Sequence, residues 1–325
     1  MGLLEIYSVQ KSRVSREGKV MSFEIPPGKE RFFSDTKQKV ELLIRKNILS
    51  GIKHYELQGW LNNFSSPRAL YLAAHLLDAF IYRSPDMLKS MRRHMLEMQL
   101  AAALQRSGYK VPITVDDFLN GLKEGNRNLP IRFVSVDGGF DKTPGKSGAA
   151  LLRNFREDGL VNKGITVRPE DVEKLPQYIE WLVLVDDFVG TGKQAEKFFK
   201  YYGVEQWAVS RNVILLSFMA HSVGVAKIAK DCSFVNFDCA EILSGSHGFF
   251  ASIPSGMMWG RDDYNSVKDV KDFYYNEVLL SKGVVLKQSE FDLDLTIAFN
   301  RTIPNNTLAA YWTSKGQWCP LINRG

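Results

Sequence analysis

Three short apolar segments constrain the fold of this chain more than any other feature of its sequence. They cover residues 131–136, 181–185 and 213–218. Segments of this length with few polar residues are typical of strands that are buried on both faces of a parallel sheet. Stretches with the residue pattern of a helix follow them, at 149–156, 194–202 and 223–230. Strands that alternate with helices in this way predict an α/β fold built on a parallel sheet.

The residues before this alternation have a helical pattern instead. In residues 30–49 the apolar side chains recur at the spacing of one helix face. Two serine–proline pairs, Ser66–Pro67 and Ser84–Pro85, each offer an N-cap followed by a proline in the first turn, which predicts two helix starts. We therefore expect a helical N-terminal region over residues 1–128 and an α/β domain with a C-terminal cap segment over residues 129–325.

The composition is that of a globular protein. The chain has 325 residues, of which 45% are hydrophobic and 24% charged, so intrinsic disorder is excluded as its main state. No apolar run approaches the roughly 18 residues of a membrane-spanning helix, and we expect no membrane partner. The N-terminus has no secretory-signal pattern, and the three cysteines have no CxxC spacing, so we expect reduced thiols in a cytoplasmic protein. The net charge of +6 mildly favours anionic ligands.

The segment most informative about chemistry is residues 182–194. An apolar strand leads to the adjacent carboxylates of Asp186 and Asp187, and a turn rich in glycine and threonine then opens a helix. Ligands of open α/β sheets bind at the carboxyl ends of the strands, and a helix N-terminus reached through a glycine turn is a ready phosphate site. Carboxylates can accept hydrogen bonds from a ribose diol while the N–H groups hold its 5′-phosphate. The segment therefore predicts a sugar-phosphate site.

A nucleotide-binding P-loop is a different interpretation of Gly190–Lys193, and the spacing excludes it. That motif needs a glycine five positions before its second glycine, and a serine or threonine after the lysine. Asp187 and Gln194 occupy those two positions here. An aspartate in the first of them would place negative charge against a polyphosphate.

The same segment resembles the motif with which type I phosphoribosyltransferases bind phosphoribosyl pyrophosphate (PRPP). The resemblance implies a parallel α/β sheet of the type I kind, in which Asp186 and Asp187 are the catalytic carboxylates and hold the ribose hydroxyls. It implies Mg²⁺ as the cofactor, held mainly through the ligand and by these two carboxylates. It assigns the 5′-phosphate to the loop residues Gly190, Thr191, Gly192, Lys193 and Gln194. The sequence departs from the family pattern at Gly190, Lys193 and Gln194, where the family has threonine, glycine and threonine.

In that family an earlier strand leads into a loop that binds pyrophosphate, and residues 137–148 lie in the matching place. The residues that the resemblance assigns to this loop and the helix after it are Asp137, Lys142, Lys146, Ser147, Gly148 and Arg153. They offer positive charge, a hydroxyl and accessible backbone N–H groups. The alternative is a surface loop whose lysines are simply solvated.

A wider resemblance covers most of the chain. Residues 60–64 with the helical stretch after them, and the tail at 302–308, look like the corresponding parts of phosphoribosyltransferase-like proteins from bacterial conflict systems. Some of those proteins are encoded beside reverse transcriptases in retron-type antiphage cassettes. The resemblance implies a defence effector or accessory role, with a reverse transcriptase and its RNA or DNA as the partner complex.

The tail offers two further candidates, Asn305 and Asn306, which follow a predicted strand at 295–299. A loop that leaves a strand end can project side chains over the ligand crevice, and asparagine can recognise polar groups there. We expect Asn306 to lie close to the crevice that holds the acidic pair. The alternative is that the two asparagines only form a turn, as they often do after proline.

Three functions remain open at the level of the sequence. The first is an enzyme that transfers phosphoribosyl from PRPP to an acceptor with the help of Mg²⁺. The second is a non-catalytic sensor or assembly module in a retron-type protein–nucleic-acid defence complex. The third is a phosphoribosyltransferase-like fold whose site has decayed.

Overall fold

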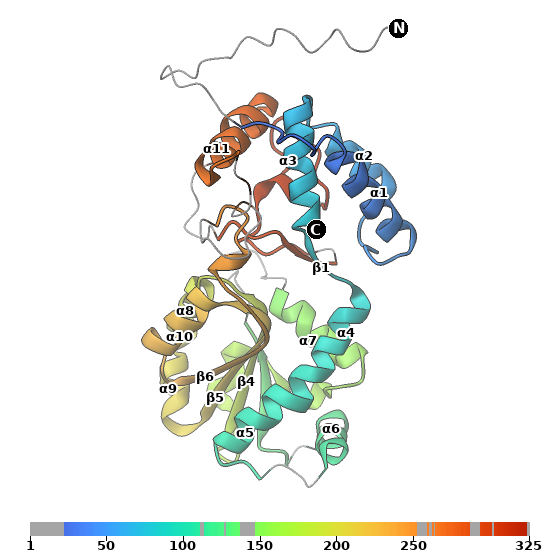
Figure 1. Cartoon of the computed structure of the whole chain (residues 1–325). Helices are drawn as coiled ribbons and strands as arrows, with labels where there is room; N and C mark the ends of the chain where they lie inside the picture. The colour runs from blue at the N-terminus through green and yellow to red at the C-terminus, as the bar shows by residue number, and fades with distance from the viewer. Residues whose placement is uncertain are drawn as a thin grey trace, which may run out of the picture. The chain divides into compact units, whose positions relative to one another are not determined.

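The computed structural model describes residues 23–110, 114–126, 128–136, 147–251, 259, 262, 264–286, 293–300 and 302–323 (Figure 1). The chain divides into two compact units. Unit 1 consists of Met1–Ile81, Ser246–Ile297 and Thr307–Gly325, and unit 2 of Tyr82–Gly245 and Ala298–Asn306. Among the described residues, no helix has both the length and the apolar character that crossing a membrane requires.

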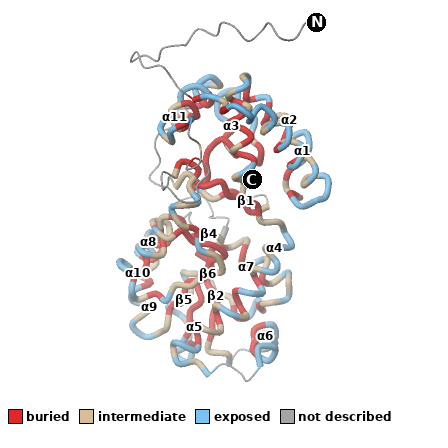
Figure 2. The backbone as a smooth tube through the Cα atoms, in the orientation of Figure 1, coloured by how far each residue is buried: buried red, intermediate tan, exposed pale blue. Residues whose placement is uncertain are grey.

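Unit 2 is built on a five-stranded sheet in the order β3-β2-β4-β5-β6, and every neighbouring pair in it is parallel. Its strands are β2 (Ile131–Ser135), β3 (Thr166–Val167), β4 (Trp181–Val189), β5 (Asn212–His221) and β6 (Val235–Leu243). The central strands are almost wholly buried, as Figure 2 shows for β2, β4 and β5. This confirms the predicted α/β fold with a parallel sheet.

Helices cover both faces of this sheet. On one face α8, α9 and α10 pack against apolar side chains of β4 and β5, and α4 and α7 lie on the other side (Figure 1). The helices of unit 2 are α4 (Pro85–His94), the π-helix η1 (Met95–Leu100), α5 (Ala101–Arg106), α6 (Val115–Glu124), α7 (Ser147–Glu157), α8 (Lys193–Tyr202), α9 (Val204–Ser210) and α10 (Ser222–Asp231), with short 3₁₀ turns η2 (Lys163–Ile165) and η3 (Pro169–Lys174). The three helices predicted behind the apolar strands correspond to α7, α8 and α10.

The compact units do not follow the predicted boundary after residue 128. Helices α4 to α6 precede that boundary, yet they belong to the unit that contains the sheet. The physical reason is the apolar face of η1, on which Met95, Leu96 and Leu100 are fully buried and which packs against β5 and β6. Helix spacing in the sequence shows that a helix has such a face, but not which element covers it.

Unit 1 joins the N-terminal helices to two later parts of the chain. Its elements are α1 (Phe32–Arg45), α2 (His54–Leu61), α3 (Pro67–Asp78), α11 (Val267–Asp272), the π-helix η5 (Phe273–Leu279), and the 3₁₀ turns η4 (Gly245–His247, which starts in unit 2), η6 (Leu280–Lys282) and η7 (Ala309–Tyr311). The Trp60 indole donates to the Ala310 carbonyl at 2.7 Å, and the Tyr311 hydroxyl donates to the Leu76 carbonyl at 2.7 Å. These buried hydrogen bonds hold the C-terminal segment against α2 and α3.

Local sequence signals for the helix starts are confirmed. The Ser66 hydroxyl accepts a hydrogen bond from the Ala69 N–H at 3.1 Å, and the Ser84 hydroxyl accepts one from Met87 N–H at 3.3 Å. The strand predicted at 295–299 is shorter, β7 (Ile297–Phe299), and it pairs with β1 (Ile81–Arg83). The chain passes from one unit to the other within these two strands.

A buried ion pair ties α4 to the end of α7, and we predict that unit 2 depends on it. Arg92 Nε donates to Asp158 Oδ2 at 2.5 Å, and the two side chains are only 9% and 15% exposed. Asp158→Asn should lower the free energy of unfolding by about 3 kcal/mol, because it leaves a buried guanidinium without its counter-charge. Urea denaturation measures this change in the free energy of unfolding. Asp171→Asn, which breaks the exposed pair of Asp171 with Lys174, is the matched control and should leave the unfolding midpoint unchanged. An equal, small effect of both substitutions would contradict the prediction.

Candidate functional site

The acidic pair lies inside β4 rather than after it. β4 continues to Val189 because β5 pairs with it along the same stretch, with Asp186 opposite Ser217 and Val189 opposite Ala220. Asp186 is buried, Asp187 is half-buried, and the Asp187 N–H donates to Asp186 Oδ1 at 2.9 Å. Strand pairing therefore fixes the backbone that carries both carboxylates, near the carboxyl end of the central strand.

Burial makes the Asp187 carboxyl unusual. The loss of hydration raises its pKa to about 6, although hydrogen bonds from the Asp186 side chain and from backbone N–H groups partly oppose the rise. Burial makes the ionised form of this carboxyl unfavourable. A hydroxyl or cation that takes the place of the missing water would stabilise the ionised form. Raised pKa values of this kind are frequent at functional sites.

The predicted phosphate loop is a tight turn into α8. Gly192 has a φ of 78°, in the left-handed region that favours glycine, and it occupies the N-cap position of α8. Its carbonyl accepts the first helical hydrogen bond, from the Glu196 N–H at 3.0 Å. Gly192 has no side chain to cap the helix, so an anion is a suitable acceptor for the first-turn N–H groups. The side chains of Thr191, Lys193 and Gln194 around this turn are half-buried.

A second helix start lies against the same loop. A Cβ atom on Gly224, in the first turn of α10, would lie 2.3 Å from the Gly190 carbonyl oxygen and 3.1 Å from the Gly192 nitrogen. His221 caps α10, its Nδ1 accepting a hydrogen bond from the Val223 N–H at 3.2 Å. Neither His221 nor Gly224 was predicted from the sequence. A glycine in the first turn of a helix that follows an apolar strand is the signal that could have identified the close approach.

The strand that precedes the predicted pyrophosphate loop ends beside β4. The Val136 N–H donates to the Val185 carbonyl at 2.9 Å, and a Cβ atom on Gly148 would lie 2.3 Å from the Val136 carbonyl oxygen. Gly148, in the first turn of α7, thus packs against the end of β2 at the same sheet edge as Asp186. Asp137, Lys142 and Lys146 lie outside the described residues, as does the side chain of Ser147. Arg153 is exposed on α7.

The tail segment 298–306 covers part of this edge within unit 2. The Phe299 ring lies 6.3 Å from the ring of Phe188 and 6.4 Å from the ring of Phe218. Asn306 is buried, and its Oδ1 would lie only 2.0 Å from a Cβ atom on Gly190. The structure thus places Asn306 beside Gly190 of the predicted phosphate loop, whereas Asn305 is exposed.

The donors at this edge limit the kind of metal site that they could form. Among the residues that the structure describes, no group of three or more histidine, cysteine, aspartate or glutamate side chains could hold a metal ion alone. Asp186 and Asp187 supply carboxylate oxygens, which suit Mg²⁺, and this ion commonly completes its shell with substrate phosphates and water. The residues present fit a Mg²⁺ ion that arrives with a phosphorylated ligand.

A parallel sheet with an acidic pair, a glycine turn and two helix N-termini at its carboxyl edge defines a phosphoribosyltransferase-like protein. Comparison with protein-family models supports this class: the model described as PRTase-CE matches residues 57–324. The match covers most of the chain, and the chain belongs to the PRTase-CE family. A search of curated proteins found no match to this chain.

The contact between Gly190 and Asn306 leads to a prediction about packing. Gly190 is outside the left-handed region, and the three atoms nearest to a Cβ added there all belong to the Asn306 side chain. Gly190→Ala should destabilise the protein by about 1–3 kcal/mol, because a buried side chain must shift. In an Asn306→Ala background the same substitution should have a clearly smaller effect, measured by urea denaturation as a double-mutant cycle.

Gly121→Ala is the matched control for that cycle, because nothing lies within 4 Å of the added Cβ atom on α6. It should be neutral or slightly stabilising. Strictly additive effects of Gly190→Ala and Asn306→Ala would show that the two residues do not contact each other.

The raised pKa of Asp187 predicts a pH dependence of stability. The folded protein binds this proton more tightly than the unfolded chain does, so between pH 3.8 and about 6 the stability contributed by this group falls as the pH rises. Asp187→Asn should therefore be more stable than the unchanged protein at pH 7.5, and this advantage should shrink towards pH 4. Denaturant titrations at several pH values measure it. An advantage that is constant with pH, or a loss of stability at pH 7.5, would contradict the account.

Proposed function

We propose that the carboxyl edge of the unit 2 sheet binds PRPP or a related phosphoribosyl ligand together with Mg²⁺, and transfers its phosphoribosyl group to an acceptor. The observation that carries the proposal is the placement of the Asp186–Asp187 pair, near the end of β4, shortly before the Gly190–Gly192 turn and the start of α8. Carboxylates for a diol and N–H groups for a phosphate thus lie at one strand end. Membership of the PRTase-CE family supports the same ligand class.

Each end of a ribose 5-phosphate group has a partner in this arrangement. Asp186 and Asp187 would accept hydrogen bonds from the ribose hydroxyls. The backbone N–H groups of the 190–194 loop would bind the 5′-phosphate. Lys193, at the first position of α8, would add a charge-assisted contact to that phosphate.

The proposed transfer breaks the bond between the anomeric carbon and pyrophosphate, and forms a bond from that carbon to the acceptor nucleophile. Positive charge develops on the sugar ring as the bond breaks, and the carboxylates next to the ribose stabilise it. When bound, Mg²⁺ would neutralise charge on the departing pyrophosphate, with Asp186 and Asp187 as its protein ligands. Gly148 and Arg153 would face the pyrophosphate.

The biological setting is part of the proposal. The wider resemblance of the chain supports a cytoplasmic antiphage effector that works with a reverse transcriptase and its RNA or DNA. The net charge of +6 is compatible with anionic partners of this kind.

A second candidate function is binding without transfer, as a sensor or assembly module in such a defence complex. The observation that favours it is the altered loop, in which Gly190, Lys193 and Gln194 replace two threonines and a glycine of the family pattern. In addition, the Asn306 side chain occupies the space beside Gly190 that a threonine side chain would need.

We predict that the double substitution Asp186→Asn with Asp187→Asn abolishes the binding of PRPP in the presence of Mg²⁺. The amides keep the size of the side chains but lose the charge that a metal and a diol require. Isothermal titration of PRPP into both proteins, with and without Mg²⁺, measures the effect, and circular dichroism establishes that the variant is folded. The matched control, Asp262→Asn, changes an acidic residue of unit 1 and should leave the affinity unchanged.

Unchanged PRPP affinity in the folded double variant would refute the site. A pyrophosphate-release assay then separates the two candidate functions. Release that depends on an added acceptor and disappears in the double variant supports transfer, whereas binding without turnover supports the sensor.

A further inference from the structure

Two buried nitrogen atoms of unit 1 have no hydrogen-bond partner, and they belong to rings that contact each other. They are Nε2 of His75, on α3, and Nε1 of Trp259. The centroids of the two rings are 4.3 Å apart, and Trp259 is only 3% exposed. Buried polar atoms without a partner are rare in folded proteins, and each of them lowers stability because water cannot reach it.

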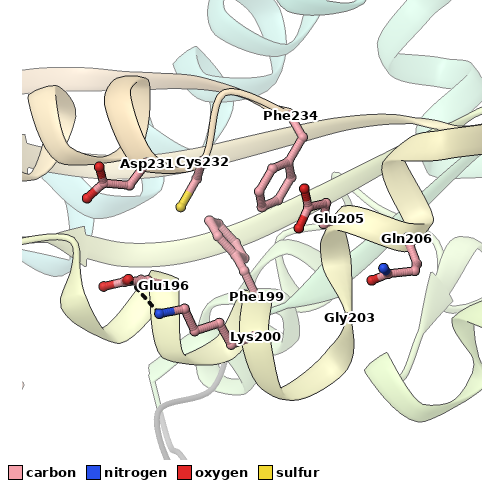
Figure 3. Close-up of a pocket in the computed structure, with 9 residues that line it drawn as sticks. All are labelled: Glu196, Phe199, Lys200, Gly203, Glu205, Gln206, Asp231, Cys232 and Phe234. Atoms are coloured by element: carbon pink, nitrogen blue, oxygen red, sulfur yellow. Dashed lines mark hydrogen bonds and ion pairs between the residues drawn. The ribbon is translucent and has the colours of Figure 1, made fainter.

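The carboxylates around a pocket in unit 2 show the usual arrangement. This pocket lies between α8, α9 and the connection from α10 to β6, and Glu196 in its lining is paired with Lys200 at 3.0 Å (Figure 3). Asp231, also in the lining, is paired with Lys227 at 2.8 Å. The unpaired nitrogens of His75 and Trp259 are therefore a feature of one particular contact.

Aromatic rings surround this contact. The His75 ring centroid lies 4.6 Å from that of Phe32 and 4.6 Å from that of Tyr71. The Trp259 ring packs edge to face on Phe249, with the centroids 5.6 Å apart. Phenylalanine rings offer a charged imidazole neither water nor a hydrogen-bond acceptor in the plane of its N–H groups.

The charged groups near the imidazole do not make up for this loss of water. The titratable groups that surround it are Lys29, Tyr71, Asp78 and Asp262. The Asp262 carboxylate already accepts hydrogen bonds from the Tyr264 N–H at 2.9 Å and from the side-chain amide of Asn265 at 2.8 Å. The loss of hydration lowers the pKa of His75 to about 4, and attraction to Asp262 and Asp78 opposes the change only in part.

Protonation changes how the two rings fit together. A neutral imidazole that keeps its proton on Nδ1 presents a lone pair at Nε2, which is compatible with the indole N–H of Trp259. An imidazolium carries N–H groups on both nitrogens, so both rings are then donors and the buried side holds no acceptor for them. If Trp259 leaves the cluster, water can satisfy both nitrogens.

We propose that the contact between His75 and Trp259 is a pH-sensitive switch, which holds Trp259 in the aromatic cluster at neutral pH and releases it in acid. The direction follows from the two protonation equilibria. The docked imidazole binds a proton less tightly than one in water, so the docked arrangement loses stability as the pH falls below 6.5, the ordinary pKa of histidine.

Exchange of the Trp259 indole N–H for deuterium, followed by NMR on the full chain, measures the release, because a buried N–H exchanges when its surroundings open. Trp259→Phe assigns the resonance. The exchange rate is divided by that of His75→Phe, which keeps an aromatic ring but cannot titrate, so the intrinsic pH dependence of exchange cancels. For a pKa of 6.5 when released and about 4 when docked, the ratio should rise roughly 25-fold from pH 7.5 to pH 5.0.

Matched variants separate this switch from other effects of acid. His75→Gln is a second reference without a titrating ring, should His75→Phe fail to fold. His54→Gln removes an exposed histidine of α2 and should leave the 25-fold rise unchanged. The buried indole N–H of Trp60, which donates to the Ala310 carbonyl, should show no such rise.

A ratio that stays constant between the two pH values would overturn the proposal. So would a ratio that falls, which would show that the ring faces stabilise the imidazolium. An equal rise at Trp60 would show that unit 1 unfolds as a whole and would also overturn it. The switch is independent of the phosphoribosyl site, and the double variant Asp186→Asn, Asp187→Asn should show the same rise.

Discussion

The hydrogen-bonded pairing of β4 with β5 is the interaction on which the candidate site depends. The pairing continues past Val185, where the first apolar run of β4 ends, so Asp186 and Asp187 are held in a strand where a loop was expected. It costs the folded protein free energy, because the Asp187 carboxyl loses hydration and its pKa rises to about 6. It also ends both strands at one level, and α8 and α10 then begin side by side.

Close backbone approach at Gly190, Gly192 and Gly224 follows from that arrangement. Side chains at Gly190 and Gly224 would collide with the neighbouring segment, and the left-handed φ of Gly192 turns the chain into α8. Asn306 then fills the space beside Gly190 from a segment far away in the sequence. The loop is thus packed against the first turn of α10 and against the Asn306 side chain.

Local patterns predicted much of this architecture. The apolar runs became β2, β4 and β5, the helices behind them became α7, α8 and α10, and both serine–proline signals start helices. The strand–aspartate–glycine segment also predicted the turn into α8, because that signal is contained in a dozen consecutive residues.

What the sequence did not reveal depends on contacts between distant residues. The extension of β4 to Val189 needs β5 as a partner, and the assignment of α4 to unit 2 needs the sheet that covers η1. The pairing of β1 with β7 and the close approach of Gly224 to Gly190 also join residues that are far apart in the sequence.

Hydrogen–deuterium exchange with and without PRPP and Mg²⁺ tests the central claim most directly, since it reports on the backbone N–H groups that are proposed to hold the phosphate. The account predicts that the ligand slows exchange in the peptide that covers residues 189–197, where the loop enters α8. Peptides from unit 1 should exchange at unchanged rates. Unchanged exchange in the 189–197 peptide, under conditions where titration shows that PRPP is bound, would contradict the account.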